Sequence, residues 1–112
     1  FRDIIFYQEL EYLSHVYSDR FKLIHLLTRE EEPEIHGPNF FKGRPTLDFV
    51  TRFCKNPTNM LVYACGAGIT KWQKKKAKTT NIQPAQRFLE GITEIVKGLN
   101  IDKKRYKREA YG

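Results

Sequence analysis

The sequence predicts an α/β fold with an open parallel sheet and flanking helices. Helical and strand patterns alternate along the chain in the order helix, strand, helix, strand, helix, strand. Two of the strands, at residues 21–28 and 60–65, are almost entirely apolar. Such runs are typical of parallel strands that are covered by helices on both faces.

The first half of the chain opens with an amphipathic helix over residues 1–17, for which Asp3 is a suitable N-cap. On the strand that follows, His25 is expected to be a satisfied core histidine. Residues 29–45 are polar and contain three prolines and two glycines, which predicts a long loop. Thr46 is then expected to cap a short helix.

In the second half, a turn at residues 56–59 leads into the strand at 60–65. A helix is expected to begin near Ile69 and to break at residues 79–81. Pro84 suits the first turn of the next helix. The apolar positions of that helix are Phe88, Leu89, Ile92, Ile95, Val96 and Leu99.

The C-terminal part of the chain is expected to contain one more strand. Gly98 or Asn100 would end the preceding helix. Residues 105–111 alternate in character, which indicates a last, more exposed strand.

Charge is the most unusual property of the composition. The 112 residues include 20 Lys or Arg and 13 Asp or Glu, so the formal net charge is +7. Much of the positive charge lies in residues 71–78 and 103–108. A basic surface attracts polyanions, so the charge alone is compatible with a nucleic acid, an acidic protein or a phosphorylated cofactor. It is equally compatible with solvated helix faces.

Other features of the composition exclude several classes of protein. Hydrophobic residues make up 40% of the chain, which is typical of a globular domain. Cys54 and Cys65 are too few for a disulfide framework and lack zinc-site spacing, so no metal site is expected. Reduced thiols and a cytoplasmic location are the default. No apolar run approaches the roughly 20 residues of a membrane span, and none is expected.

The most specific pattern is the segment from Val62 to Gly68, Val-Tyr-Ala-Cys-Gly-Ala-Gly. An apolar strand ends in Cys-Gly, and a turn bracketed by glycines leads into a helix. Ligands of open α/β sheets bind at the carboxyl ends of the strands, where glycine permits close approach and a helix N-terminus favours anions. The alternative is a tight strand-to-helix turn that contains a buried cysteine.

This segment resembles the VYxCGP motif of the ferredoxin-reductase superfamily, with Ala67 in place of the usual proline. Residues 21–30 resemble that family's third strand and end in a Thr-Arg-Glu version of its SRE motif. Gly43 and Arg44 resemble the start of its GR(V/I)T motif. Residues 105–112 resemble the ending Glu-x-(Phe/Tyr)-Gly. The resemblance extends over essentially the whole chain.

The resemblance implies that residues 1–112 form a single partial domain, the C-terminal part of a Rossmann-like NAD(P)-binding domain. In that family the sheet order is 3-2-1-4-5, and this chain would supply strands 3, 4 and 5. The flavin-binding barrel, the pyrophosphate loop and the two central strands are then expected upstream. Those two strands would lie between residues 21–28 and 60–65.

The activity implied is hydride transfer between NAD(P)H and FAD, followed by electron transfer to an iron–sulfur or haem partner. Cys65 would lie beside the nicotinamide and Tyr111 would stack on the flavin, so both are assigned catalytic roles. The residues assigned to cofactor binding are Thr28, Arg29, Gly43, Arg44, Cys65, Gly66, Ala67, Gly68 and Tyr111. The alternatives are a buried hydrophobe at Cys65, a solvated loop at Arg29 and an exposed terminal residue at Tyr111.

The choice of coenzyme depends on two opposing signals. Arg29 offers a planar fork that suits the 2′-phosphate of NADP. Acidic residues at this place favour NAD, and residues 30–32 are three glutamates. We expect NADPH because Arg29 is nearer the end of the strand, and because the glutamates can turn outward with the loop.

Two other functions are compatible with the sequence. A small basic α/β module that binds nucleic acid is supported by the two Lys/Arg clusters and by Trp72 and Tyr106 within them. No RNP, KH or zinc-finger pattern accompanies them, and we expect no nucleic-acid partner. A domain that has kept the fold and lost the cofactor is the third alternative.

Overall fold

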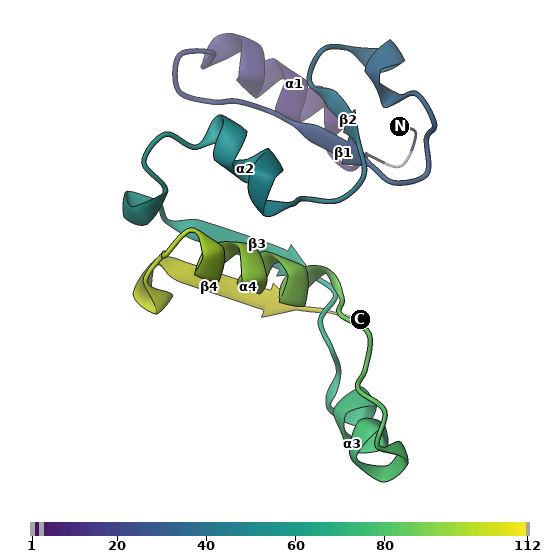
Figure 1. The fold of residues 1–112 in the computed structure, drawn as a ribbon. Helices are drawn as coiled ribbons and strands as arrows, with labels where there is room; N and C mark the ends of the chain where they lie inside the picture. Colours follow the sequence, from purple (N-terminus) through teal and green to yellow (C-terminus); the bar gives the residue numbers. More distant parts are fainter. Residues whose placement is uncertain (1, 3, 112) are drawn as a thin grey trace. The chain divides into compact units, whose positions relative to one another are not determined.

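The computed structural model describes residues 2 and 4–111, and the chain forms two compact units, Phe1–Arg44 and Pro45–Gly112 (Figure 1). The described residues contain four α-helices and two separate two-stranded sheets, both parallel. The prediction of an α/β protein with parallel strands is therefore confirmed. The prediction of one open sheet is not, because each sheet here contains two strands.

The first unit contains α1 (Tyr7–Val16), β1 (His25–Leu27), the 3₁₀ helix η1 (Pro33–His36) and β2 (Phe40–Lys42). The residue before α1 is Phe6, whose φ is 58° and which makes no side-chain cap. The expected cap, Asp3, lies outside the described residues.

The prediction of a long loop over residues 29–45 was wrong in part. This segment contains η1 and β2, and β2 pairs with β1 in register from His25↔Phe40 to Leu27↔Lys42. The expected strand over 21–28 is correspondingly short. A strand of three residues is too brief for an alternating pattern to reveal it.

The core of the first unit is a stack of rings. His25 and Phe40 are buried, and their ring centroids lie 4.5 Å apart. Tyr7 of α1 lies against both of these rings. Glu11 Oε1 is 3.5 Å from His25 Nε2, and neither buried atom makes a hydrogen bond among the described residues. His25 is thus a core residue, as expected, but its Nε2 faces the Glu11 carboxylate without the expected hydrogen bond.

The second unit is larger and holds seven elements. They are α2 (Leu47–Phe53), the 3₁₀ helix η2 (Pro57–Asn59), β3 (Val62–Gly66), α3 (Lys71–Thr80), α4 (Phe88–Gly98), the 3₁₀ helix η3 (Lys103–Arg105) and β4 (Tyr106–Ala110). β3 and β4 pair in parallel from Val62↔Tyr106 to Gly66↔Ala110. This pairing agrees with the expected order, in which strands 4 and 5 are neighbours.

Helix α4 forms the core of this unit by packing on one face of the β3–β4 pair (Figure 1). Its Leu89 is completely buried, and burial of a leucine side chain contributes about 1.5–3 kcal/mol. The buried cluster consists of Ile95, Val96, Leu99 and Ile101, packed against Val50, Met60, Val62, Ile92 and Tyr106.

The opposite face of β3 is exposed. Leu61 and Tyr63 are 62% and 75% exposed, and Cys65 is exposed as well. Side chains of a strand alternate between faces, so one face of β3 is covered by α4 and the other by no described element of this unit. The expectation that helices cover this strand on both faces was therefore wrong for the unit as described.

The N-terminus of α2 was predicted correctly from local sequence signals, and that of α4 was not. Thr46 Oγ1 accepts the backbone N–H of Phe49 at 3.1 Å, which confirms the predicted cap of α2. Helix α4 begins at Phe88, so the prediction that Pro84 occupies its first turn was wrong. Its N-terminus is instead capped by Glu90, whose carboxylate accepts the backbone N–H of Arg87 at 3.2 Å.

Helix α4 ends in a Schellman motif. Asn100 has a φ of 58°, and its N–H donates to the Lys97 carbonyl at 3.1 Å. The Ile101 N–H donates to the Val96 carbonyl at 3.2 Å, and both of these side chains belong to the core. The predicted end at Gly98 or Asn100 is confirmed.

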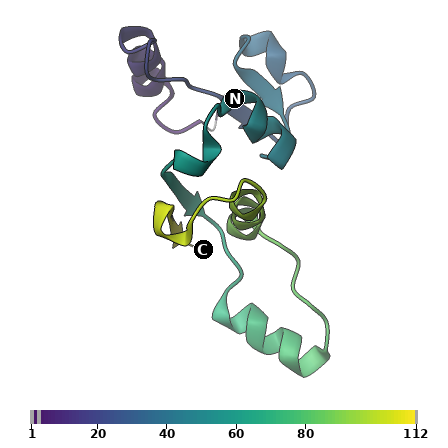
Figure 2. The same cartoon turned by 60° about the vertical axis from the view of Figure 1, so that its left-hand side comes forward.

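Helix α3 has no buried residues. It is joined to the strand and to α4 by two extended connections (Figure 2). Thr70 and Gln73 form a capping box at its start, and Asn81 adopts a φ of 57° at its end. In the part of the chain that the structure describes, no helix has the length and apolar character needed to cross a membrane.

Candidate functional site

The first group of expected site residues lies at one edge of the β1–β2 pair. Thr28 and Arg29 follow β1, whereas Gly43 and Arg44 follow β2. Because the strands are parallel, their carboxyl ends meet, and the Gly43 N–H donates to the Leu27 carbonyl at 3.1 Å. The structure therefore brings these four residues to the same edge.

Gly43 is required at this edge by the backbone. Its φ is 105°, in the region that residues with a side chain rarely adopt. A Cβ at this position would meet no atom within 4 Å, so space is not the constraint. The turn at Gly43 carries the chain from the end of β2 to Arg44.

The charges at this edge are distributed unevenly. Arg29 and Arg44 are exposed, and no ion pair joins either guanidinium to a described carboxylate. Two of the three glutamates that follow β1 do have cationic or imidazole partners. Glu30 Oε2 lies 2.6 Å from His36 Nε2, and Glu31 Oε2 lies 2.8 Å from Lys42 Nζ. The hydrogen bond and the charge of Lys42 lower the pKa of Glu31.

The second group lies at the carboxyl end of the β3–β4 pair. Cys65 and Gly66 end β3, and Tyr111 follows β4. The Tyr111 N–H donates to the Gly66 carbonyl at 3.0 Å, which extends the pairing by one hydrogen bond. Cys65 is exposed, and Tyr111 is 65% exposed. The alternative of Cys65 as a buried hydrophobe does not fit this unit.

Gly66 has a structural reason to be glycine. It is buried, and a Cβ built on it would lie 2.4 Å from Cδ2 of Phe88. The first residue of α4 thus occupies the space where a side chain would be. At Gly68 a Cβ would meet Leu89 and Arg108 at 3.4 Å, the short end of ordinary contact.

The loop after β3 is held in place by α4 through what we call the Glu90 clamp, formed by Glu90, Ile69, Arg87 and Arg108. Glu90 Oε1 accepts the backbone N–H groups of Ile69 at 3.1 Å and of Arg87 at 3.2 Å. Glu90 Oε2 accepts a hydrogen bond from Arg108 of β4 at 3.3 Å. One carboxylate therefore connects the loop, the helix and the second strand.

Electrostatics favour the ionised form of Glu90. Desolvation by burial acts to raise the pKa of Glu90. The hydrogen bonds from Ile69, Arg87 and Arg108 act in the opposite direction, and the net effect is a lowered pKa. The carboxylate is thus charged at neutral pH, and charge-assisted hydrogen bonds are the stronger kind.

Further hydrogen bonds fix the same loop. The Leu89 N–H donates to the Ala67 carbonyl at 3.0 Å, and Arg87 Nη1 donates to the Gly68 carbonyl at 3.4 Å. Every residue from Gly66 to Ile69 therefore makes at least one backbone hydrogen bond to α4, its cap or the residue after β4.

Sequence reasoning did not identify Phe88, Glu90 or Arg108 as part of this region. Only half of a capping-box pattern was present: Glu90 stands three residues after Arg87, but Arg87 is not one of the usual N-cap residues. The contact of Glu90 with Ile69, 21 residues away, had no local signal.

These two edges differ in what they can bind. The edge of β1–β2 presents two guanidinium groups, which suit a phosphorylated ligand. The edge of β3–β4 presents a thiol and an aromatic ring beside an ordered loop. Among residues 2 and 4–111, no three His, Cys, Asp or Glu side chains are grouped so that they could hold a metal ion.

The chain matches no model of a known protein family, no curated protein and no solved structure.

Proposed function

We propose that this chain is the pyridine-nucleotide-binding part of a flavin-dependent oxidoreductase of the ferredoxin-reductase type, with a Rossmann-like fold. The reaction is hydride transfer between NAD(P)H and FAD, with electrons passed on to an iron–sulfur or haem partner. FAD would be held mainly by a flavin-binding domain outside residues 1–112. The nicotinamide and flavin rings supply the redox chemistry, and this chain binds and orients them.

One observation supports the proposal above the others. The residues that the motif resemblance assigns to the coenzyme all lie at or after the carboxyl ends of parallel strands. Four follow β1 and β2, and five lie at or after the ends of β3 and β4. That is the edge at which open α/β sheets bind their ligands. The resemblance itself implies that β3 and β4 are parallel neighbours, whereas the parallel pairing of β1 with β2 was not expected from it.

The chemistry of the β1–β2 edge fits a 2′-phosphate. That group is a dianion near neutral pH, and two exposed guanidinium groups without a carboxylate partner among the described residues can give it charge-assisted hydrogen bonds. Glu30 and Glu31 are engaged with His36 and Lys42, which leaves Arg29 as the charge nearest the end of the strand. This arrangement favours NADPH over NADH.

The chemistry of the β3–β4 edge fits the nicotinamide and flavin rings. An exposed thiol at Cys65 would contact the nicotinamide, and Tyr111 presents an aromatic face for stacking. The Glu90 clamp fixes the loop between Gly66 and Ile69, so the backbone there is already ordered before a ligand binds. Such order lowers the entropic cost of binding.

A titration of the chain with coenzyme, followed residue by residue in amide NMR spectra, tests the proposal. NADPH should shift the signals of Thr28, Arg29 and Arg44 in the first unit, and those of residues 65–68 in the second. Adenosine 2′-phosphate, which lacks the nicotinamide, should shift only the first set. Absence of saturable shifts at either edge with NADPH or NADH would contradict the proposal.

The competing function, a basic nucleic-acid-binding module, is favoured by one feature. From Phe49 to Leu89 the chain has no Asp or Glu but has two arginines and six lysines. If a single-stranded oligonucleotide shifted α3 signals at concentrations where NADPH shifted none, this alternative would replace the oxidoreductase proposal.

A further inference from the structure

We propose that α3 and the segment that returns from it, residues 82–85, form a docking surface for an acidic protein partner. This surface, which we call the α3 surface, does not depend on coenzyme binding. It would remain if the oxidoreductase proposal failed, since none of its residues belongs to either strand edge.

The positive charge of α3 is not balanced by nearby carboxylates among the described residues. Five lysines of α3 are exposed, and no described carboxylate lies within ion-pair distance of any of them. They are Lys71, Lys74, Lys75, Lys76 and Lys78. Two other basic side chains of this unit do have such partners: Arg108 contacts Glu90, and Lys97 contacts Glu94.

Repulsion among these lysines destabilises α3. Lys71 and Lys75, and Lys74 and Lys78, stand four residues apart, a spacing at which like charges repel. The helix buries no residue and is only 10 residues long, so packing does not offset the repulsion. A partner that brings carboxylates would relieve it, which couples binding to the stability of α3.

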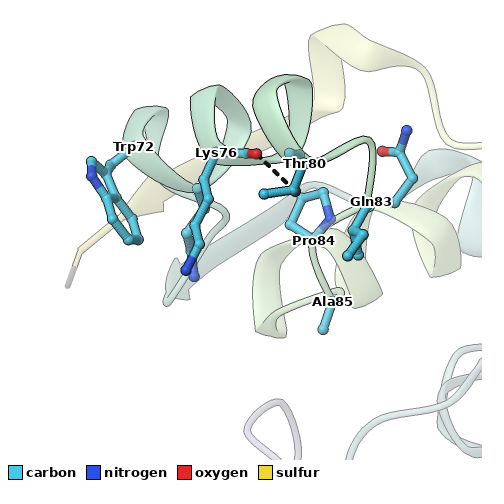
Figure 3. Close-up of a pocket in the computed structure, with 9 residues that line it drawn as sticks. Trp72, Lys76, Thr80, Gln83, Pro84 and Ala85 are labelled. Carbon is cyan, nitrogen blue, oxygen red and sulfur yellow. Dashed lines mark hydrogen bonds between the residues drawn. The ribbon is translucent and has the colours of Figure 1, made fainter.

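An apolar hollow lies beside these lysines. A hollow of about 310 Å³ lies between α3 and the returning segment and is lined by Trp72, Lys76, Thr80, Ile82 and Pro84 among others (Figure 3). Trp72 and Ile82 are 67% and 70% exposed. The Lys76 ammonium lies 5.1 Å from the centre of the Trp72 ring. An apolar hollow that contains an exposed tryptophan resembles the centre of a protein-binding hot spot, and the lysines supply a charged rim.

The same residues argue for a protein rather than a nucleic acid. Lysine is a point charge, and α3 has no arginine to hold a phosphate with two hydrogen bonds. A single strand is typically held by several aromatic platforms in succession. Trp72 is the one aromatic residue between Cys65 and Phe88. The partner that fits carries clustered Asp and Glu around an exposed apolar side chain.

Trp72 also makes the proposal directly measurable, because it is the only tryptophan in the chain. The probe is a short peptide of glutamates flanking one leucine, added to the chain at low ionic strength. Its binding should shift Trp72 emission to the blue, since the indole becomes buried, and the effect should weaken as salt is added. An identical peptide with glutamine in place of glutamate should bind at least about tenfold more weakly.

Two matched variants decide whether the site is α3 or positive charge in general. A variant with Lys74→Gln, Lys75→Gln and Lys78→Gln should lower the affinity for the peptide by at least about tenfold. A variant with Lys103→Gln, Lys104→Gln and Lys107→Gln removes the same charge from the same unit and should change it less than about twofold. Equal losses in both variants would overturn the proposal.

Further measurements separate loss of the site from loss of the helix. A variant with Lys74→Arg, Lys75→Arg and Lys78→Arg should keep the affinity. Far-ultraviolet circular dichroism should show that the helix content of the whole chain is unchanged in both α3 variants. Absence of any change in Trp72 emission with the acidic peptide would overturn the proposal. Tighter binding of a single-stranded oligonucleotide than of the peptide would replace the protein partner with nucleic acid.

Discussion

The ring of Phe88 lies over the α-carbon of Gly66, so closely that a Cβ on residue 66 would come within 2.4 Å of Phe88 Cδ2. Two reasons for this glycine are therefore distinguishable. One is the approach of a ligand to the backbone at the end of β3. The other is the packing of α4 on the strand. The close contact with Phe88 is by itself enough to require glycine at position 66.

Replacement of Gly66 by alanine should lower the free energy of unfolding by about 1–3 kcal/mol, because the added methyl overpacks the contact with Phe88. Urea denaturation measures this. Gly91→Ala is the matched control: a Cβ there meets no atom within 4 Å, so alanine should stabilise α4 by about 0.5–1 kcal/mol. Unchanged stability in Gly66→Ala would leave ligand approach as the remaining reason.

The Glu90 clamp predicts a defined pH dependence. Glu90→Gln should lower the free energy of unfolding by about 1–3 kcal/mol at pH 7, since it removes the charge that accepts three hydrogen bonds. The pKa of Glu90 is lowered in the folded state from the ordinary 4.5. Its contribution is therefore fully present above pH 4.5 and is lost as the pH falls through the lowered value.

The difference in stability between the original chain and Glu90→Gln should thus narrow as the pH is lowered from 4.5. Glu94→Gln, on the same helix, is the control, because its exposed contact with Lys97 is 3.9 Å long. That variant should change stability by less than about 0.5 kcal/mol. A difference for Glu90→Gln that stays constant across this range of pH would show that its charge is unimportant.

Cys65 is predicted to act on the rate of the reaction. In a protein that combines this chain with its flavin domain, Cys65→Ala should slow flavin reduction by roughly tenfold or more while weakening coenzyme binding less. Stopped-flow reduction at saturating coenzyme measures the limiting rate. Cys54→Ala, at a residue that follows α2, should leave that rate unchanged. If the two variants behave alike, Cys65 has no part in positioning the nicotinamide.

Arg29 is predicted to select the coenzyme. Arg29→Ala should raise the KM for NADPH by roughly tenfold, about 1.4 kcal/mol, with little effect on NADH. Arg20→Ala provides a control in the turn between α1 and β1, where the guanidinium lies 5.0 Å from the centre of the Tyr17 ring. Equal effects on both coenzymes, or an original protein that prefers NADH, would show that the glutamates after β1 set the preference.

Local chemistry was the part of the fold that the sequence predicted well. The Thr46 cap and the end of α4 depend on residues within a few positions of each other, and both were found as expected. The start of α4 was misplaced because Pro84 gives the same local signal whether or not a helix follows. The helix begins at Phe88, where the carboxylate of Glu90 accepts hydrogen bonds from the backbone N–H groups of both Arg87 and Ile69.

Long-range features were beyond local reasoning. The pairing of Phe40–Lys42 with β1 depends on three residues inside a segment rich in glycine and proline. The exposed face of β3 could not be anticipated either, because an apolar run has the same pattern whether one or both faces are covered. For the candidate site, the sequence predicted residues at the strand ends but not the clamp that orders the loop between them.

The hydrogen bond from the Leu89 N–H to the Ala67 carbonyl has a consequence for how a protein of this kind can diverge. Residues 70–86 leave the β3–β4 sheet and its covering helix α4 and return to them at almost the same point. The number of residues between these points is therefore nearly independent of the sheet and the core. Insertions and deletions concentrate where the fold tolerates them, and closing a shorter loop costs little entropy. Replacing residues 70–86 with a short glycine linker should keep the midpoint of thermal unfolding within a few degrees of that of the original chain. A change of about 1 kcal/mol in the free energy of unfolding has an effect of this size in a small domain. Related proteins could then share the core and still differ widely in residues 70–86, and so in the partner that the α3 surface binds.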